Sequence, residues 1–252
     1  MSRWHRAGAV LLALFLSAPV AADSITVFAD ASLKAGLDAV ANAFKAKSGH
    51  DVAVSYGPTP LLARHIQNGA PADLFITDEP QLVDGLEARQ MIVPGSRKPL
   101  VASELVLVAP SGSTAEAKLA PGVNLAALLG EGRLVMAHPD QTPAGRNGKA
   151  ALTAVGAWNS ILPRISGAPN GRVAVAAVAR GQFPLGIAAR SEAMADKGVR
   201  IVDAFPSGSH PRAIFTMALV ARMSPPAAFD LADYLATREA AEMFQRSGFD
   251  SP

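Results

Sequence analysis

The fold is decided by the stretch Ile25-Thr26-Val27-Phe28-Ala29-Asp30-Ala31-Ser32-Leu33-Lys34. Its apolar run is typical of a short buried strand, and the small residues that follow favour a turn. Apolar residues then recur at helical spacing, and Gly49 is a good stop signal. The sequence therefore predicts a strand, a turn, and a helix from Leu33 to about Ser48 with Ser32 as its N-cap.

Ser32 is expected at the carboxyl end of a strand and the amino end of a helix. In an open α/β sheet this is where ligands bind, because backbone N–H groups and the positive end of the helix dipole point into the same space. An anion suits such a site. Helix capping alone also explains a serine at this position, so the rest of the chain must decide between the two interpretations.

A second unit repeats the same pattern. Residues 51–56 read as a strand, and Thr59 followed by Pro60 predicts a helix start, with threonine as N-cap and proline at the first helical position. Two hydroxyl groups on neighbouring strand–helix units can converge on one anion.

The first 22 residues are expected to be a secretory signal peptide: a basic start, an apolar run too short to span a membrane, and a small-residue cleavage site before Asp23. Without Arg3 and Arg6, 21 of the 23 basic residues remain against 21 acidic ones, so the mature protein is near neutral and nucleic acid is not an expected partner. The chain has no cysteine, which excludes disulfides, thiolate metal sites and a lipid anchor on an N-terminal cysteine. We therefore expect a freely diffusing periplasmic protein.

The chain is 50% apolar but only 6% aromatic, a composition typical of sheets covered by helices on both faces. The predicted fold class is α/β with two lobes, each a mostly parallel sheet flanked by helices, and with a ligand cleft between them. The expected boundaries are 23–104 and 212–252 for lobe 1 and 105–211 for lobe 2. Further strands are expected at 70–77, 105–109, 132–137, 184–189, 199–204 and 215–220, and further helices at 82–90, before Gly156, over 173–180 after Asn170, and over 225–247.

Several motifs together carry a family resemblance. They are 25–29 with Ala31-Ser32-Leu33, Gly69-Ala70-Pro71-Ala72-Asp73-Leu74-Phe75-Ile76, Pro143-Ala144-Gly145, Leu152 with Gly156-Ala157-Trp158, Pro184-Leu185-Gly186-Ile187 and Ala240-Ala241-Glu242-Met243-Phe244. In this order along the mature chain, the sequence resembles the periplasmic molybdate-binding proteins that feed ABC transporters. The run from Gly69 to Ile76 is the most specific of them.

The resemblance implies a hinged two-lobed protein, a monomer without cofactor or catalytic residues, that passes molybdate to an inner-membrane ABC permease. Members of this family hold the oxyanion with hydroxyl and backbone N–H donors. Molybdate is a dianion at neutral pH, so dipoles and N–H groups suffice to stabilise it. Tungstate is close to molybdate in size and charge, and the sequence does not separate the two.

Five positions of this chain match the family's ligand-binding positions, as contacts to the molybdate oxygens: Ser32, Thr59, Ala144, Gly171 and Ala189. The hydroxyl is retained at the first two, and the next two supply backbone N–H groups. Ala189 replaces the family's usual tyrosine and removes a hydroxyl, which a water or the neighbouring Arg190 could replace. Both Pro58 and Pro60, which flank Thr59, lack an N–H.

The same fold could also bind a different anion, namely sulfate, phosphate or a small organic anion. A phosphate site is expected to offer a buried proton acceptor. Asp30 is the candidate, although it is also explained as a turn carboxylate at a helix start.

Two rival classes of function depend on the histidines. A hydrolytic triad would combine Ser32 with His138 and Asp140, or with His210, but the sequence around Ser32 lacks the glycines of a nucleophile elbow. A metal site would use His50, His65, His138 and His210, none of which has the close spacing that places two ligands on one helix face.

Overall fold

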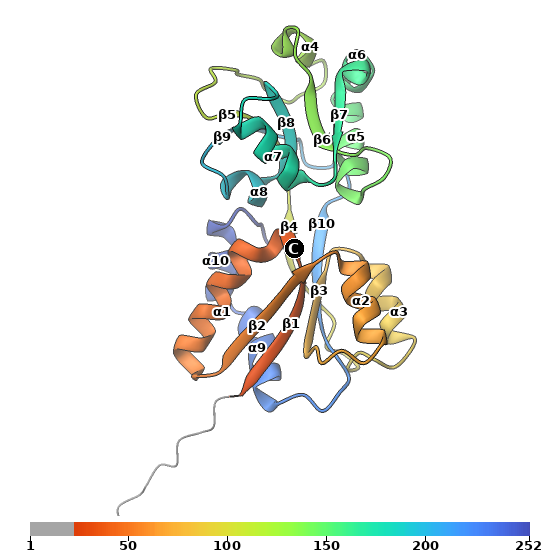
Figure 1. Ribbon diagram of the computed structural model, residues 1–252, viewed down its shortest axis with the longest axis vertical. Helices are drawn as coiled ribbons and strands as arrows, with labels where there is room; N and C mark the ends of the chain where they lie inside the picture. The colour runs from red at the N-terminus through yellow and green to blue at the C-terminus, as the bar shows by residue number, and fades with distance from the viewer. Residues whose placement is uncertain (1–22) are drawn as a thin grey trace, which may run out of the picture.

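The structure is a computed structural model that describes residues 23–252. The predicted signal peptide lies outside these residues. Two lobes, each built on one five-stranded sheet, lie one above the other (Figure 1). The expected α/β fold with helices on both faces of each sheet is confirmed.

Lobe 1 contains the sheet with strand order β2-β1-β3-β10-β4. Its strands are β1 (Ser24–Asp30), β2 (Asp51–Gly57), β3 (Leu74–Thr77), β4 (Lys98–Ser103) and β10 (Ala213–Leu219). Because β10 runs antiparallel to both of its neighbours, the other four strands share one direction and their carboxyl ends meet at one edge.

The helices of lobe 1 cover both faces of this sheet. They are η1 (Ala31–Leu33), α1 (Lys34–Ser48), α2 (Thr59–Gln67), α3 (Pro80–Glu87), α9 (Pro226–Leu235) and α10 (Arg238–Arg246). Successive side chains of β1 point to opposite faces of the sheet and so pack against different helices. Ile25 and Val27 pack with α1, α9 and α10, whereas Phe28 packs with α2 and α3.

Lobe 2 contains the sheet with strand order β7-β6-β8-β5-β9. Its strands are β5 (Leu105–Pro110), β6 (Leu134–Ala137), β7 (Ile165–Ala168), β8 (Leu185–Ala189) and β9 (Val199–Ala204). Its helices are α4 (Leu125–Leu129), α5 (Pro143–Ala154), α6 (Trp158–Ile161), η2 (Leu162–Arg164), α7 (Gly171–Ala179) and α8 (Arg190–Met194). Here β5 is the antiparallel strand, so this sheet is also mostly parallel.

Two segments connect the lobes: Glu104, between β4 and β5, and residues 205–212, between β9 and β10 (Figure 1). The Arg190 side chain lies at the first crossing, where Nη2 is 2.6 Å from Glu104 Oε2, and its backbone N–H donates to the Glu104 carbonyl. Arg190 thus fixes the start of α8 to the crossing segment and does not line the cleft described below.

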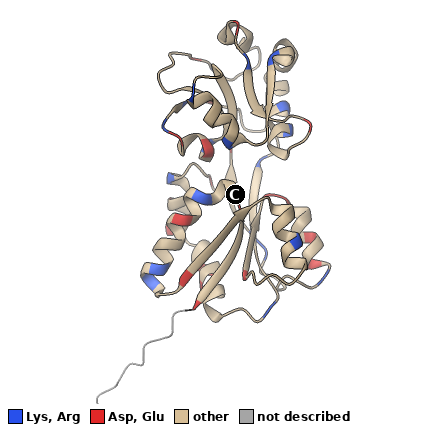
Figure 2. Cartoon of the chain, viewed as in Figure 1, with Lys and Arg blue, Asp and Glu red and all other residues tan. Residues whose placement is uncertain are grey.

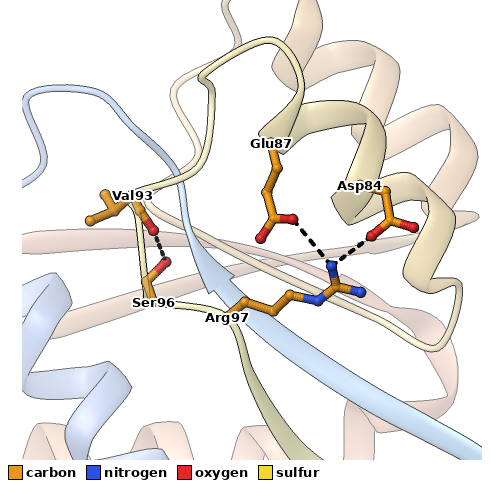
Figure 3. A network of polar contacts seen from close by, with 5 residues as sticks. All are labelled: Asp84, Glu87, Val93, Ser96 and Arg97. Atoms are coloured by element: carbon orange, nitrogen blue, oxygen red, sulfur yellow. Dashed lines mark hydrogen bonds and ion pairs between the residues drawn. The ribbon is translucent and has the colours of Figure 1, made fainter.

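The loop that enters β4 is held by one arginine. Figure 3 shows the Arg97 guanidinium between two carboxylates of α3, with Nη1 at 2.6 Å from Asp84 Oδ1 and 3.2 Å from Glu87 Oε2. Ser96 Oγ donates to the Val93 carbonyl at 2.7 Å. Such exposed ion pairs contribute about 0.2–1 kcal/mol each, so they orient the loop more than they stabilise the lobe.

Two details of the C-terminal segment differ from the sequence-based expectation. The helix predicted over residues 225–247 is two helices: α9 ends at Leu235, and Thr237 caps α10, its side chain accepting from the Ala240 N–H. Phe229, expected on the packing face, is 46% exposed, whereas Leu231, Leu235 and Phe244 are buried as expected.

Acidic and basic side chains are interspersed over both lobes (Figure 2). The described part of the chain contains no helix long and apolar enough to cross a membrane.

Candidate binding site

A cleft of about 720 Å³ lies between the lobes, at the carboxyl ends of β1 and β3 on one side and of β6 and β8 on the other. Its lining includes all five positions singled out in the sequence: Ser32, Thr59, Ala144, Gly171 and Ala189. Residues more than 150 positions apart in the chain therefore meet around one space, as the strand-end argument predicts.

Ser32 reaches the cleft from η1, but it does not cap a helix. Asp30 caps η1, since its Oδ1 accepts from the Ser32 backbone N–H at 2.8 Å and from Ser32 Oγ at 2.6 Å, whereas α1 has Leu33 at its N-cap position and no side-chain cap. The expected Ser32 N-cap is therefore wrong. A carboxylate two residues upstream competes successfully for the local N–H group. The interpretation of Asp30 as a turn carboxylate at a helix start is correct.

Thr59 is the first residue of α2, and Pro58 occupies the N-cap position in place of the predicted Thr59. Thr59 is 1% exposed, and its Oγ1 donates to Glu79 Oε1 at 2.9 Å. Because Pro60 has no N–H, the Thr59 N–H is the donor that this helix start can offer to the cleft.

Ala144 lies in the first turn of α5. Pro143 supplies no N–H, and the Thr142 hydroxyl accepts from the Gly145 N–H at 2.9 Å. The first N–H groups of a helix have no partner within it, so the Ala144 N–H is left to serve the cleft. Gly145 is required here, since a side chain would overlap the carbonyl of His138.

Gly171 opens α7, where Asn170 caps the helix by accepting from the Val173 N–H at 2.9 Å. The carboxylate of Glu192 accepts from the Ala189 N–H at 3.1 Å. Gly171 is packed so closely against this carboxylate that a Cβ would overlap Glu192 Oε2. Burial raises the pKa of Glu192.

Ala189 ends β8 and lines the cleft. Its backbone N–H is already bound by Glu192 Oε2, so the residue offers the cleft neither a hydroxyl nor a free N–H. Any replacement for the family's tyrosine hydroxyl must come from another part of the lining.

Charged residues that the sequence-based reasoning did not select also line the cleft. On lobe 1, Asp78 and Glu79 directly follow β3, beside Asp30 at the end of the adjacent β1. Burial, together with the charges of Asp30 and Glu79, raises the pKa of Asp78 to about 6. On lobe 2, Arg146 and Arg172 follow the starts of α5 and α7.

Arg172 also spans the cleft. Its Nη2 donates to the Ala31 carbonyl of lobe 1 at 2.7 Å. This hydrogen bond joins two residues 141 positions apart and connects the start of α7 to η1. This contact bridges the two walls of the cleft on this side.

The floor of the cleft lies at the lobe crossings and presents Ser103 and His210. Ser103 is 5% exposed, and within residues 23–252 neither its Oγ nor His210 Nε2 has a hydrogen-bonding partner. His210 Nδ1 lies 3.0 Å from Ser209 Oγ, and burial lowers the pKa of the imidazole. A neutral imidazole whose Nδ1 accepts from Ser209 carries its proton on Nε2 and can donate it into the cleft.

The geometry does not assemble the rival sites. The Ser32 hydroxyl is bonded to Asp30, whereas His138 lies outside the cleft lining and His210 pairs with Ser209. Over residues 23–252, no group of three or more His, Cys, Asp or Glu side chains is arranged to hold a metal ion.

This combination of two lobes and a polar cleft between them defines a solute-binding protein. The sequence comparison agrees: residues 25–250 match the family described as bacterial extracellular solute-binding protein, and the chain belongs to that family.

The particular relatives are molybdate-binding proteins. The chain is 38% identical to the molybdate-binding protein ModA of Escherichia coli (strain K12) over 226 residues, which cover 89% of this chain and 88% of that one. It is 29% identical to ModA of Haemophilus influenzae over 233 residues, covering 92% and 91% of the two chains.

Solved structures show the same fold. The periplasmic molybdate-binding protein of Azotobacter vinelandii matches with a TM-score of 0.73 and 19% identity, over 90% of this chain and 99% of that one. The sulfate-binding protein SubI of Mycobacterium tuberculosis matches with a TM-score of 0.67 and 22% identity, over 90% and 86%.

Proposed function

We propose that this protein captures molybdate, and tungstate with it, in the cleft between its lobes and delivers the anion to an inner-membrane ABC permease. It performs no covalent chemistry and needs no cofactor. The relatives named ModA support the choice of anion, and membership of the solute-binding family supports the transport role.

One observation carries the proposal. Three helix starts that are far apart in sequence, those of α2, α5 and α7, surround one cleft, and each leaves a backbone N–H without an acceptor in its own helix: those of Thr59, Ala144 and Gly171. Unpaired N–H groups at helix starts stabilise an anion without a counter-charge. Ser32, Thr59, Ala144 and Gly171 are the contacts we propose, with Ala189 closing the cleft.

The same proposal includes export and assembly. The protein acts in the periplasm as a freely diffusing monomer, after removal of residues 1–22 and without a lipid anchor. Lobe 1 comprises 23–104 and 212–252, and lobe 2 comprises 105–211. The placement of β4 and β10 in one sheet and of β5 and β9 in the other supports this division.

Titration calorimetry on residues 23–252 tests the function with molybdate, tungstate, sulfate and phosphate in turn. We expect tight binding of molybdate and tungstate. On binding, the Ser32 and Thr59 hydroxyls turn from Asp30 and Glu79 to the anion. Ser32→Ala and Thr59→Ala should therefore each weaken molybdate binding about tenfold to a hundredfold, because a hydrogen bond to a charged group contributes about 1.5–3 kcal/mol. Ser48→Ala, which removes a hydroxyl bonded to the Phe44 carbonyl outside the cleft, is the matched control. Unchanged affinity in both cleft variants would remove the site assignment.

Phosphate is the second candidate, and a specific observation favours it. Asp30 and Asp78 place carboxylate oxygens in the lining of the cleft, and a carboxylate can accept the proton that hydrogen phosphate carries. A calorimetric response to phosphate and none to molybdate would select this candidate over the first.

A further inference from the structure

Three carboxyl groups, all able to accept protons, line the lobe 1 side of the cleft. Asp30 follows β1, and Asp78 and Glu79 follow β3; these strands are parallel neighbours, so their three carboxyl groups border one part of the cleft. The two hydroxyls on this wall already donate their protons to these carboxylates, Ser32 to Asp30 and Thr59 to Glu79.

This arrangement is unfavourable for a bare dianion. A hydroxyl has one proton, so Ser32 and Thr59 can donate to a ligand oxygen only by leaving their carboxylates. The freed carboxylates would then face a doubly charged anion across a short distance in a partly buried site. Like charges at such separations disfavour ionisation of the carboxyl group and raise its pKa.

Other charged groups of the cleft offset this only in part. From lobe 2, Arg146 and Arg172 bring two positive charges, while Glu192 adds a further carboxylate. His210, on the floor, is held toward its neutral form by burial. The unpartnered Oγ of Ser103 on the same floor, 5% exposed, is an independent indication that a ligand oxygen is received there.

We propose that the cleft takes up its oxyanion together with one proton, and that Asp78 carries this proton and donates it in a hydrogen bond to a ligand oxygen. The inference rests on the proposed function. For molybdate, which arrives fully deprotonated, the proton comes from the solvent, and no covalent bond is made or broken.

Asp78 is suited to this role before any ligand binds. Its pKa is raised to about 6 by burial and by its two acidic neighbours, so the carboxyl group is already close to protonation at neutral pH. A bound dianion raises this pKa further, so the complex holds a proton that the free protein has lost. Above the pKa of the free protein, affinity should then fall about tenfold for each pH unit.

Calorimetry with molybdate from about pH 6 to pH 8 tests the inference. At about pH 7.5, buffers of different ionisation enthalpy should report about one proton taken up per molybdate. The dissociation constant should weaken about thirtyfold to a hundredfold across this range. Asp78→Asn, which resembles the protonated carboxyl group, should retain binding, reduce this change to less than about threefold, and abolish the proton uptake. Asp230→Asn, on the exposed face of α9, should behave as the wild type.

The experiment distinguishes a failure of this inference from a failure of the proposed function. Tight molybdate binding with no proton uptake and a flat pH profile overturns the inference and leaves the proposed function standing. A profile that stays steep in Asp78→Asn overturns the assignment to Asp78. Absence of molybdate binding at every pH overturns the proposed function and the inference with it.

Discussion

Replacing Gly171 by alanine tests whether the two starts of α7 and α8 are held together by one carboxylate. An added Cβ would overlap Glu192 Oε2 and lie 2.8 Å from Glu192 Cδ, so the carboxylate must move. It would then lose its bond to the Ala189 N–H. A hydrogen bond to a charged group contributes about 1.5–3 kcal/mol, so we expect Gly171→Ala to lower the free energy of unfolding by about that amount.

Urea unfolding measures this change, and a second glycine provides the control. Gly85 lies inside α3, where a Cβ would meet only Arg89 Nη1 at 3.8 Å. Gly85→Ala should therefore raise stability by about 0.5–1 kcal/mol, the usual gain from removing a helical glycine.

A double-mutant cycle separates this cause from a general loss of helix stability. With Glu192→Ala in place, the carboxylate is absent and Gly171→Ala should cost less than about 1 kcal/mol. If the cost is the same with and without Glu192, the reasoning about the carboxylate is refuted.

Three further outcomes follow from the site and its surroundings. Because the pKa of Asp78 is raised in the folded protein, the folded state binds more protons than the unfolded state between about pH 4 and pH 6, and stability falls as pH rises through this window. After allowance for solvent screening of a half-buried group, Asp78→Asn should therefore have a free energy of unfolding about 1–2 kcal/mol higher than the wild type at pH 7.5. This difference should vanish at pH 4. Urea unfolding that gives the same difference at both pH values would contradict the predicted pH dependence. Arg172→Ala removes the hydrogen bond to the Ala31 carbonyl of lobe 1. In small-angle scattering without ligand, this variant should have a larger radius of gyration than the control Arg146→Ala, because the structure shows no such bond between the lobes from Arg146 within residues 23–252. Thr237→Ala should lower stability by about 0.5–2 kcal/mol through loss of the α10 cap, whereas Thr153→Ala on the exposed face of α5 should not.

The sequence predicts those elements whose signals are local. The strand that ends near Asp30 and the helix that ends at Gly49 are both present, and Gly49 has the left-handed backbone, with φ of 80°, that favours glycine. The strand β4 was not predicted. It carries Pro99 and forms the edge of its sheet, where the missing N–H of a proline does no harm.

The position of the cleft was easier to predict than the groups that line it. The strand-end rule places Ser32 and Thr59 at the cleft, and it applies equally to Asp78 and Glu79, which directly follow β3; their position was a usable signal that was missed. The partners of the hydroxyls were not accessible from sequence. The bond from Thr59 to Glu79 joins residues 20 positions apart, and it depends on how two loops pack in space.

The order of strands in lobe 1 has a consequence for how the chain acquires its structure. The C-terminal strand β10 lies between β3 and β4, and Asp250 forms a bridge with Ala102 of β4. The sheet of lobe 1 is therefore incomplete until nearly the last residue is available. All strands of lobe 2 lie between residues 105 and 204. During synthesis from the N-terminus, the strands of lobe 2 are therefore complete first. The apolar faces of β1 and β3 stay exposed until β10 has been synthesised. Such long-range pairing is slow, and the interval in which lobe 1 is exposed to aggregation and proteolysis ends only with the arrival of β10.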